Sequence, residues 1–464
     1  MSTDFKPKLR LAFYGDDFTG SADALEVLTS AGLKCAMFLT VPSAELLDSL
    51  GGFDAIGIAG DSRSMSPEEM DTSLPEIFAA LKQLSPEIVH YKICSTFDSS
   101  PENGSIGHII GMVSEIFGKK AVPVVAGNPA LGRYCAFGNL FALSKTDYAV
   151  HRIDRHPVMK SHPITPMQEA DLTLHIGKQK ALKFAHINIT HLENEAALYQ
   201  SLVNISDEDD VVLIDGTTTS HMTTAGKILA ASAKHSSPLF VVGSSGVEYG
   251  LIQHWQQCED MTWSQKPEEL FDPVEQLLVI SGSASPLSCL QTGKAIERGF
   301  ADIAVDAKAL VSEAEKEKVL VEIVDKTLLL LQQGKSVVIH TAWGPDDKRI
   351  SEMINYLQTQ GMNPETARTQ GGKALSIELG RITKKILERH PLKRIIVSGG
   401  DTSSQVTKIL SPDAIVIQSH ISTGAPLCRI LSEKPYLSGL EVALKGGQMG
   451  DENYFVQALT GKSY

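Results

Sequence analysis

Two adjacent carboxylates, Asp16 and Asp17, stand where an apolar run gives way to a helical pattern. Residues 11–14 predict a short buried strand, and the residues after the aspartates predict a helix with Thr19 or Ser21 as its N-cap. Carboxylates at the end of such a strand are costly unless a hydroxyl, a cation or a metal partners them. The pattern therefore indicates a ligand site. The alternative is that Asp16 caps the turn and Asp17 is merely solvated.

A basic residue follows another predicted strand in the first half of the chain. Arg63 comes just after the apolar run 54–60, so it belongs to the same edge of a parallel sheet as the two aspartates. Its guanidinium could bind a carboxylate through two parallel hydrogen bonds. The alternative is a surface arginine that pairs with Glu68 or Glu69.

The strand predicted at 88–93 ends among polar side chains. Lys92, Cys94, Ser95 and Asp98 crowd its exit and supply one cation, several donors and an acceptor. A polyhydroxylated acid requires that mixture. A covalent role for Cys94 is not expected.

Two further segments add polar and basic residues to the first half of the chain. The strand and turn predicted at 121–134 place Asn128 and Arg133 at their exit. Residues 151–172 combine three prolines with several basic side chains, among them His162, inside an acidic protein. This second segment is either a lid over an anion or a solvated linker.

Three turns rich in glycine or serine follow strands in the second half of the chain. The strand 277–280 leads into the turn 281–285, a strand within 393–398 leads into a Gly-Gly turn, and Lys445 precedes a third glycine turn. Such turns direct backbone N–H groups at an anion on a helix N-terminus, which suits phosphate. Together they predict a nucleotide-sized pocket, although each alone is compatible with an ordinary connection. The sequence contains no intact Walker A motif, and no G-x-G-x-x-G follows a strand.

The elements that must position these residues alternate between strand and helix. This alternation predicts an α/β fold with mostly parallel sheets flanked by helices. A chain of 464 residues exceeds what one hydrophobic core usually supports, so we expect two domains. Weak periodicity, prolines and charge mark residues 258–276 as the linker between an N-terminal domain, 1–257, and a C-terminal domain, 277–464.

The composition, with 42% hydrophobic and 21% charged residues, is that of an ordinary globular protein. A formal net charge of −13 argues against nucleic-acid and anionic-membrane partners. The six cysteines form no C-x-x-C pair, so neither a zinc site nor a disulfide framework is expected. The N-terminus lacks the apolar run of a signal peptide, and no segment is apolar enough to span a bilayer. We therefore expect a cytoplasmic protein.

Taken in order, the motifs resemble those of the four-carbon acid sugar kinase family, long catalogued as a domain of unknown function. The resemblance covers nearly the whole chain and depends on the ordered set. It implies an N-terminal domain that holds a sugar acid, a C-terminal domain that holds ATP, and an active site in the cleft between them. The motifs are YGDDFTGSADAL (14–25), DSRSMS (61–66), YKICSTFDSSPENGSIG (91–107), HPITPM (162–167), VISGSASP (279–286), VSGGDTSS (397–404) and ALKGGQMG (443–450).

The resemblance also implies which residues contact each ligand. The sugar acid is expected to contact Asp16, Asp17, Arg63, Lys92, Ile93, Cys94, Ser95, Asp98 and His162. ATP is expected to contact Ser281, Ser283, Gly399, Gly400, Asp401, Thr402, Gly446 and Gly447. The family's tetronate kinases usually carry aspartate where this chain has Cys94. The acid therefore stays open among D-threonate, D-erythronate, a 3-oxo-tetronate and a branched relative such as 3-oxo-isoapionate.

Phosphoryl transfer needs mostly alignment and charge neutralisation, so weak base chemistry is sufficient. Mg2+ is expected to bridge the phosphates of ATP, without a dedicated metal site in the protein. The roles that we assign are carboxylate binding for Arg63 and Lys92, hydroxyl binding for Ser95 and Asp98, and proton acceptance for the catalytic Asp17 or Asp16.

Two other classes of protein are compatible with such a chain. A nicotinamide-dependent sugar-acid oxidoreductase would use the same parallel sheets, but the glycine fingerprint is absent. A non-catalytic sugar-acid sensor would leave the C-terminal glycine turns unexplained. The expected partners are a small sugar acid and ATP, with self-association into a homodimer left open.

Overall fold

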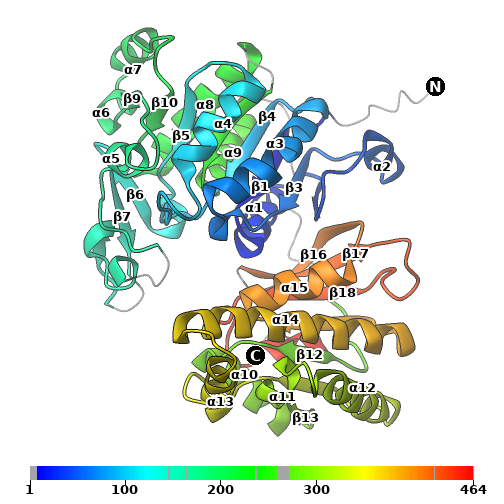
Figure 1. The fold of residues 1–464 in the computed structure, drawn as a ribbon. Coiled ribbons are helices and arrows are strands. Elements are labelled where there is room, and N and C mark those ends of the chain that lie inside the picture. Colours follow the sequence, from blue (N-terminus) through cyan, green and yellow to red (C-terminus); the bar gives the residue numbers. More distant parts are fainter. Residues whose placement is uncertain are drawn as a thin grey trace, which may run out of the picture. The chain divides into compact units, whose positions relative to one another are not determined.

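The chain folds into two compact units, residues 1–266 and 267–464, and a set of neighbouring strands forms the centre of each. Both sheets are mostly parallel and flanked by helices, which confirms the predicted α/β class (Figure 1). The computed structural model describes residues 8–144, 147–161, 165–235, 238–258, 271–422 and 424–462.

A parallel sheet forms the centre of the first unit. In spatial order its strands are β2 (Cys35–Phe38), β3 (Ala55–Ala59), β1 (Leu11–Gly15), β4 (Ile88–Lys92), β11 (Leu239–Gly243), β5 (Val122–Val125), β10 (Val211–Ile214) and β9 (Phe184–Ile187). Strand β1 is apolar throughout, with Leu11, Ala12 and Phe13 at 0% exposure, because both faces of the sheet are covered. After β3 the chain crosses from one side of β1 to the other. Open α/β sheets bind their ligands at the strand ends of such a switch point.

Helices cover both faces of this sheet (Figure 1). On one face α1 and α8 pack on α9, and on the other α3 packs on α4. The helices of this unit are α1 (Phe18–Ser30), α2 (Ala44–Ser49), α3 (Pro67–Gln83), α4 (Ile106–Phe117), α5 (Leu172–Gly177), α6 (Ile189–Leu192), α7 (Glu195–Val203), α8 (Thr219–His235) and α9 (Gly246–Cys258).

A small antiparallel sheet, β6 (Arg133–Ala136), β7 (Asn139–Leu143) and β8 (Val150–Arg152), is inserted between β5 and α5. Asp215, which follows β10 and is 0% exposed, ties this sheet to the large one. Its carboxylate accepts hydrogen bonds from Phe137 N (2.6 Å), Gly138 N (3.1 Å), Cys135 Sγ (3.2 Å) and His186 Nε2 (3.0 Å). Burial raises the pKa of Asp215, but His186 and the other donors lower it more, so it lies below its ordinary value.

The second unit has a mixed sheet. In spatial order its strands are β13 (Ala301–Ala304), β14 (Val337–His340), β12 (Leu278–Ser281), β15 (Arg394–Ser398), β18 (Glu441–Lys445), β17 (Ala425–Leu431) and β16 (Ala414–Ser422). Strands β13, β14, β12, β15 and β18 run parallel to one another. Strand β17 runs antiparallel to β18, and β16 runs antiparallel to β17.

Long helices frame the second sheet, and α14 packs on α12, α13 and α15. The helices are α10 (Pro286–Glu297), α11 (Ala307–Val311), α12 (Lys316–Gln332), α13 (Lys348–Thr359), α14 (Pro364–Arg389), α15 (Gly400–Leu410) and α16 (Tyr454–Thr460). Val279, Val338 and Ile396, all 0% exposed, form part of the core that α16 closes with Tyr454 and Phe455.

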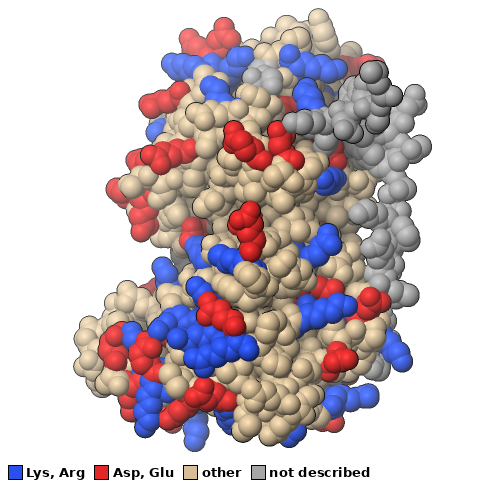
Figure 2. Space-filling view, turned by 90° about the vertical axis from the view of Figure 1, so that its right-hand side faces the viewer, with Lys and Arg blue, Asp and Glu red and all other residues tan. Residues whose placement is uncertain are grey.

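Basic and acidic side chains alternate over the face drawn in Figure 2, so charge of one sign does not dominate there. None of the helices in the described ranges is long and apolar enough to cross a bilayer. Most of the predicted linker, residues 259–270, lies outside the described residues. His162, expected to contact the substrate, lies outside them too.

Candidate functional site

The candidate acid-binding site lies where β3, β1 and β4 end. Asp16 follows β1, and its backbone N–H donates to Lys92 O at 2.8 Å. The backbone N–H of Arg63 in turn donates to Asp16 O at 3.0 Å. Three strand exits that are far apart in sequence therefore bring the predicted residues of the site together.

Arg63 is bonded to both aspartates. Its Nε donates to Asp16 Oδ2 at 3.0 Å and its Nη2 to Asp16 Oδ1 at 2.8 Å, while Nη1 lies 2.9 Å from Asp17 Oδ2. Burial lowers the pKa of Arg63, but Asp16, Cys94 and Asp17 together raise it more, so the guanidinium stays charged. Burial raises the pKa of the Asp16 carboxyl, and Arg63 opposes that shift. The alternative pairing of Arg63 with Glu68 or Glu69 is wrong.

Asp17 is the N-cap of α1, because its Oδ1 accepts a hydrogen bond from Gly20 N at 2.7 Å. The expected caps, Thr19 and Ser21, are wrong because the helix begins one residue after Asp17, where only that side chain reaches the unpaired N–H. The alternative of a capping Asp16 and a merely solvated Asp17 is wrong as well. The Asp17 side chain is 31% exposed, against 6% for Asp16, and is the more accessible carboxylate.

Lys92 is 3% exposed and surrounded by acidic groups. Burial lowers its pKa, but four carboxylates raise it more: Asp23, Asp16, Asp17 and Glu248. Its ammonium group therefore stays charged and is compensated within the protein.

Two of these acids, Asp23 and Glu248, were not predicted from the sequence. Asp23 on α1 is bonded to Ser245, and burial raises its pKa. Glu248 on α9 is 0% exposed, with Oε1 2.7 Å from His90 Nδ1 and Oε2 without a hydrogen-bond partner. Asp23 could have been found, since it lies in the same motif as the two aspartates. No pattern in the sequence marks Glu248, because it lies on a helix that is far from Lys92 in the chain and close to it only in the fold.

The polar residues after β4 form a short hydrogen-bonded chain. Cys94 Sγ lies 3.0 Å from Thr96 Oγ1, which donates to Asp98 Oδ1 at 2.6 Å. Burial, with the charge of Asp98, raises the pKa of Cys94 to about 12, so it is a thiol at neutral pH. Ser95 is half-buried at the same exit, whereas the side chain of Ile93, 2% exposed, belongs to the core.

Three strand ends lie side by side in the second unit. Ser281 of β12 pairs in register with Ser398 of β15, which pairs with Lys445 of β18. The predicted nucleotide contacts occupy these exits: Ser281 and Ser283 after β12, Gly399, Gly400, Asp401 and Thr402 after β15, and Gly446 and Gly447 after β18.

Hydroxyl groups connect the three exits. Ser285, the N-cap of α10, and Ser288 donate to Gly447 O at 2.5 and 3.1 Å. Ser288 Oγ also lies 3.1 Å from Ser398 Oγ, which accepts from Lys445 Nζ at 3.0 Å. The first turn of α10 is thereby fixed to the glycine turn that follows β18.

Glycines permit this close approach. A Cβ at Gly282 would lie 2.0 Å from Thr402 Oγ1, and one at Gly447 would lie 2.2 Å from Ser283 Oγ. Gly399 has a φ of +118°, which L side chains rarely adopt. The backbone at these turns is therefore accessible in a way that suits phosphate groups.

Lys445 is the one residue of these exits that combines deep burial with a charge. It is 1% exposed, its Nζ lies 5.8 Å from the ring centres of Tyr454 and Phe455, and no described carboxylate forms an ion pair with it. Burial lowers its pKa to about 7. Its place before the third glycine turn was the only sequence signal.

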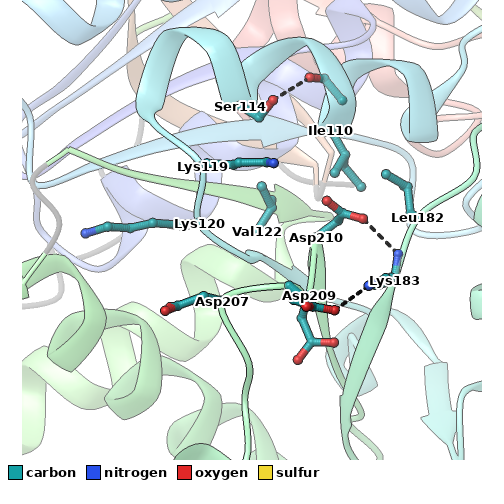
Figure 3. Close-up of a pocket in the computed structure, with 12 residues that line it drawn as sticks. Ile110, Ser114, Lys119, Lys120, Val122, Leu182, Lys183, Asp207, Asp209 and Asp210 are labelled. Carbon is teal, nitrogen blue, oxygen red and sulfur yellow. Dashed lines mark hydrogen bonds and ion pairs between the residues drawn. The ribbon is translucent and has the colours of Figure 1, made fainter.

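A hollow of about 430 Å3 lies at the opposite edge of the first unit's sheet, around the starts of β5, β9 and β10 (Figure 3). Its charged lining includes Lys119, Lys120, Lys183, Asp207, Glu208, Asp209 and Asp210. Lys183 Nζ donates to Glu208 at 2.6 Å, and its backbone N–H donates to Asp210 at 2.8 Å. Because open α/β sheets bind ligands at the carboxyl ends of strands, we do not assign the sugar acid to this hollow.

Comparison with known proteins classifies both units. Residues 11–251 match the family described as a sugar-binding N-terminal domain, and residues 278–455 match the family described as a nucleotide-binding C-terminal domain. Fold and site thus define a two-domain protein with a sugar-binding half followed by a nucleotide-binding half.

Relatives match over the whole chain. A 3-oxo-isoapionate kinase from Paraburkholderia graminis is 35% identical over 461 residues, which cover 99% of this chain and 96% of that protein. A 3-oxo-tetronate kinase from Pectobacterium atrosepticum is 26% identical and covers 97% and 98%. A crystal structure described as a putative tRNA synthase from Salmonella typhimurium has a TM-score of 0.74 at 24% identity, covers 97% and 98%, and supports the fold alone. The chain belongs to the four-carbon acid sugar kinase family, as its motifs predicted.

Proposed function

We propose that this protein is an ATP-dependent kinase that phosphorylates a hydroxyl of a small sugar acid. The first candidate is 3-oxo-isoapionate and the second is a 3-oxo-tetronate. The observation that carries the proposal is the 35% identity to a 3-oxo-isoapionate kinase over 99% of the chain, which includes both units. The charged strand exits of the first unit suit the acid, and the glycine turns of the second unit suit the phosphates.

In this proposal Asp17 accepts the proton of the attacking hydroxyl. It is the more exposed aspartate, and Arg63 Nη1 lies 2.9 Å from its Oδ2. The hydroxyl oxygen attacks the γ-phosphorus, the bond to the β–γ bridging oxygen breaks, and ADP leaves. In this proposal the first unit binds the acid and the second unit binds ATP.

The remaining polar residues of the β4 exit position the substrate. Ser95 and Asp98 bind hydroxyls of the acid, and Lys92 holds the positive charge of the site close to the transferring group. Because transfer depends mostly on alignment, these contacts are expected to contribute through orientation.

Mg2+ is proposed to enter with ATP. Within the described ranges no group of three or more His, Cys, Asp or Glu is arranged to hold a metal ion. The donor set therefore fits a cation bound mainly by phosphate oxygens and water. Asp401, exposed in the first turn of α15, is the carboxylate that could approach such an ion.

The test is ADP release with Mg-ATP against 3-oxo-isoapionate, 3-oxo-tetronates, D-threonate and D-erythronate. Turnover of one acid is expected, and Asp17→Asn should lower kcat about 100-fold or more. Asp209→Asn, at the opposite edge of the sheet, is the matched control and should retain full activity. Acid binding without ADP release, or reduction of a nicotinamide cofactor, would overturn the proposal.

A further inference from the structure

Cations at the carboxyl edge of the first unit's sheet differ in what compensates them. Arg63 is bonded to Asp16 and Asp17, and Lys92 lies among four carboxylates. A substrate carboxylate at either cation would compete with those acids for the same charge. The third cation of this edge, Arg133, has a different environment.

Arg133 is the first residue of β6, and within the described part of the chain only one nitrogen of its guanidinium group forms hydrogen bonds. Its Nη1 donates to the carbonyl oxygens of Leu131, Gly132 and Leu143 at 2.9, 3.4 and 3.4 Å. Its Nε is buried without a hydrogen-bond partner, and Nη2 bonds to none of the described residues. No described carboxylate forms an ion pair with it. The Nε–Nη2 side is the side with which Arg63 binds Asp16, and at Arg133 this side is unpaired.

Asn128 supplies an unpaired acceptor on the neighbouring segment. The backbone N–H of Asn128 donates to Arg133 O at 2.9 Å, and the backbone N–H of Arg133 donates to Asn128 O at 3.0 Å. The Asn128 side chain is 1% exposed, and its Nδ2 donates to Ser245 Oγ at 3.0 Å, so its Oδ1 is fixed but has no partner. Buried donors and acceptors without partners are rare in native proteins and often mark a ligand that completes them.

Arg133 lies within electrostatic range of Cys94, which follows β4. Cys94 acts on the pKa of both Arg63 and Arg133. His156 is close as well, and burial together with Arg133 lowers its pKa, so it is neutral at neutral pH. Arg133 therefore carries a positive charge that none of the described carboxylates neutralises.

We propose that Arg133 binds the carboxylate of the sugar acid through its Nε–Nη2 side, and that Asn128 Oδ1 accepts a hydrogen bond from the adjacent hydroxyl. The inference rests on the proposed function and replaces the carboxylate-binding role that the sequence analysis gave to Arg63 and Lys92. Arg63 acts as a positioning residue for Asp16 and Asp17, and it is not the carboxylate clamp. The ligand class is a carboxylate with a hydroxyl on the neighbouring carbon.

The experiment compares the sugar acid with the analogue in which a primary alcohol replaces the carboxylate. Arg133→Gln should raise KM for the acid about 10- to 150-fold, the size of a lost charge-assisted contact, and leave KM for ATP and for the neutral analogue unchanged. Arg133→Lys keeps the charge without the two-point geometry and should fall between. Lys183→Gln, at the opposite edge, removes one positive charge as the matched control and should change neither KM.

The outcomes separate this inference from the proposed function. If Arg133→Gln retains the preference for the acid, or lowers kcat alone, the inference is wrong. If wild-type protein binds an acid by calorimetry without turnover, and Arg133→Gln does not bind it, the kinase proposal fails and the carboxylate site stands. Binding of no acid by the wild-type protein would overturn the inference. A melting temperature like that of the wild type shows that the variant is folded.

Discussion

The two proposed ligand edges of this protein are built from different chemical groups. In the first unit, Arg63, Asp16, Asp17 and Lys92 compensate one another in a tight cluster. In the second unit, hydroxyls and glycine backbone dominate, and Lys445 carries the only buried charge at the described strand exits.

The difference shows two ways of building a ligand site. A cluster of fixed charges discriminates strongly, because a ligand of the wrong shape leaves buried polar groups unpaired. A backbone cradle depends on the space around it, because N–H groups are present whatever the side chains are. Removing a side chain should therefore damage the first edge, whereas adding a methyl group should damage the second.

The largest effect is expected from Arg63→Gln. The substitution leaves Asp16, whose side chain is 6% exposed, without its counter-ion. Breaking a buried pair in this way costs about 3 to 5 kcal/mol. Urea unfolding should show the loss, and kcat should fall because Asp17 loses its support as well. The double variant Asp16→Asn/Arg63→Gln removes both charges and should recover part of the stability. Equal losses in the single and double variants would contradict the charge-pair explanation.

Gly447→Ala tests the second edge. Its Cβ would lie 2.2 Å from Ser283 Oγ, so the turn must shift. We expect KM for ATP to rise about 100-fold, as for a displacement of the order of 1 Å at a site, with sugar-acid binding unchanged. Gly372→Ala on α14 is the control, since nothing lies within 4 Å of its Cβ. An unchanged KM for ATP in Gly447→Ala would remove this turn from the nucleotide site.

Lys445 should make ATP binding depend on pH. Its pKa is about 7, and bound phosphates favour the ammonium form, so ATP binding takes up a proton above that pH. Affinity should then fall roughly tenfold per pH unit between pH 7.5 and 9. Calorimetry in Tris and in HEPES measures the uptake, and Lys445→Met should abolish it. Constant wild-type affinity across this range would contradict the prediction.

The neighbouring groups are hydrogen-bonded elsewhere or exposed, so the predicted pH dependence can be attributed to Lys445. Tyr454 of α16 donates its hydroxyl to Ala425 O at 2.8 Å. Asp451, ahead of the same helix, accepts from Gln457, and Asp401 on α15 is exposed.

In the unfolded chain the pKa of Lys445 returns to 10.5, so the unfolded state binds more protons between about pH 7 and 10. The free energy of unfolding should therefore rise with pH in that window.

The smallest effect is expected at Cys94. Because its pKa is about 12, iodoacetamide at pH 8 should modify it far more slowly than the exposed Cys258. Cys94→Ser preserves a hydrogen bond to Thr96, so kcat should change by less than about threefold. Mass spectrometry and steady-state rates check both statements. Rapid alkylation of Cys94 would show that its thiolate is accessible.

The sequence predicted the features that depend on residues close together in the chain. Strands β1, β3, β4, β12 and β15 were found because buried parallel strands are apolar runs bounded by glycine or polar turns. Their exits could be grouped since parallel strands end at one edge. The N-cap of α1 was misplaced because a helix start is uncertain by a residue or two.

Pairings across the sheet could not be read from the sequence. Arg63 was assigned to a ligand or to surface glutamates, because nothing local shows that β3 lies next to β1. The unpaired side of Arg133 and the buried oxygen of Asn128 depend on the small sheet, whose register is set by tertiary contacts. Lys445 was noticed only as a neighbour of glycines, since burial is a property of the fold.

Asp215 gives the small sheet its own response to acid. Its pKa is lowered in the folded protein, so its contribution to stability is complete above the unfolded value and is lost as pH falls through the folded one. Protonation would weaken the bonds to Phe137 N and Gly138 N, which join the small sheet to β10. That sheet should open before the rest of its unit, and hydrogen exchange at these two amides would detect it. Since Arg133 begins the same sheet, protein brought to a pH below the ordinary pKa of an aspartate should lose selectivity for carboxylates while its nucleotide half is still intact.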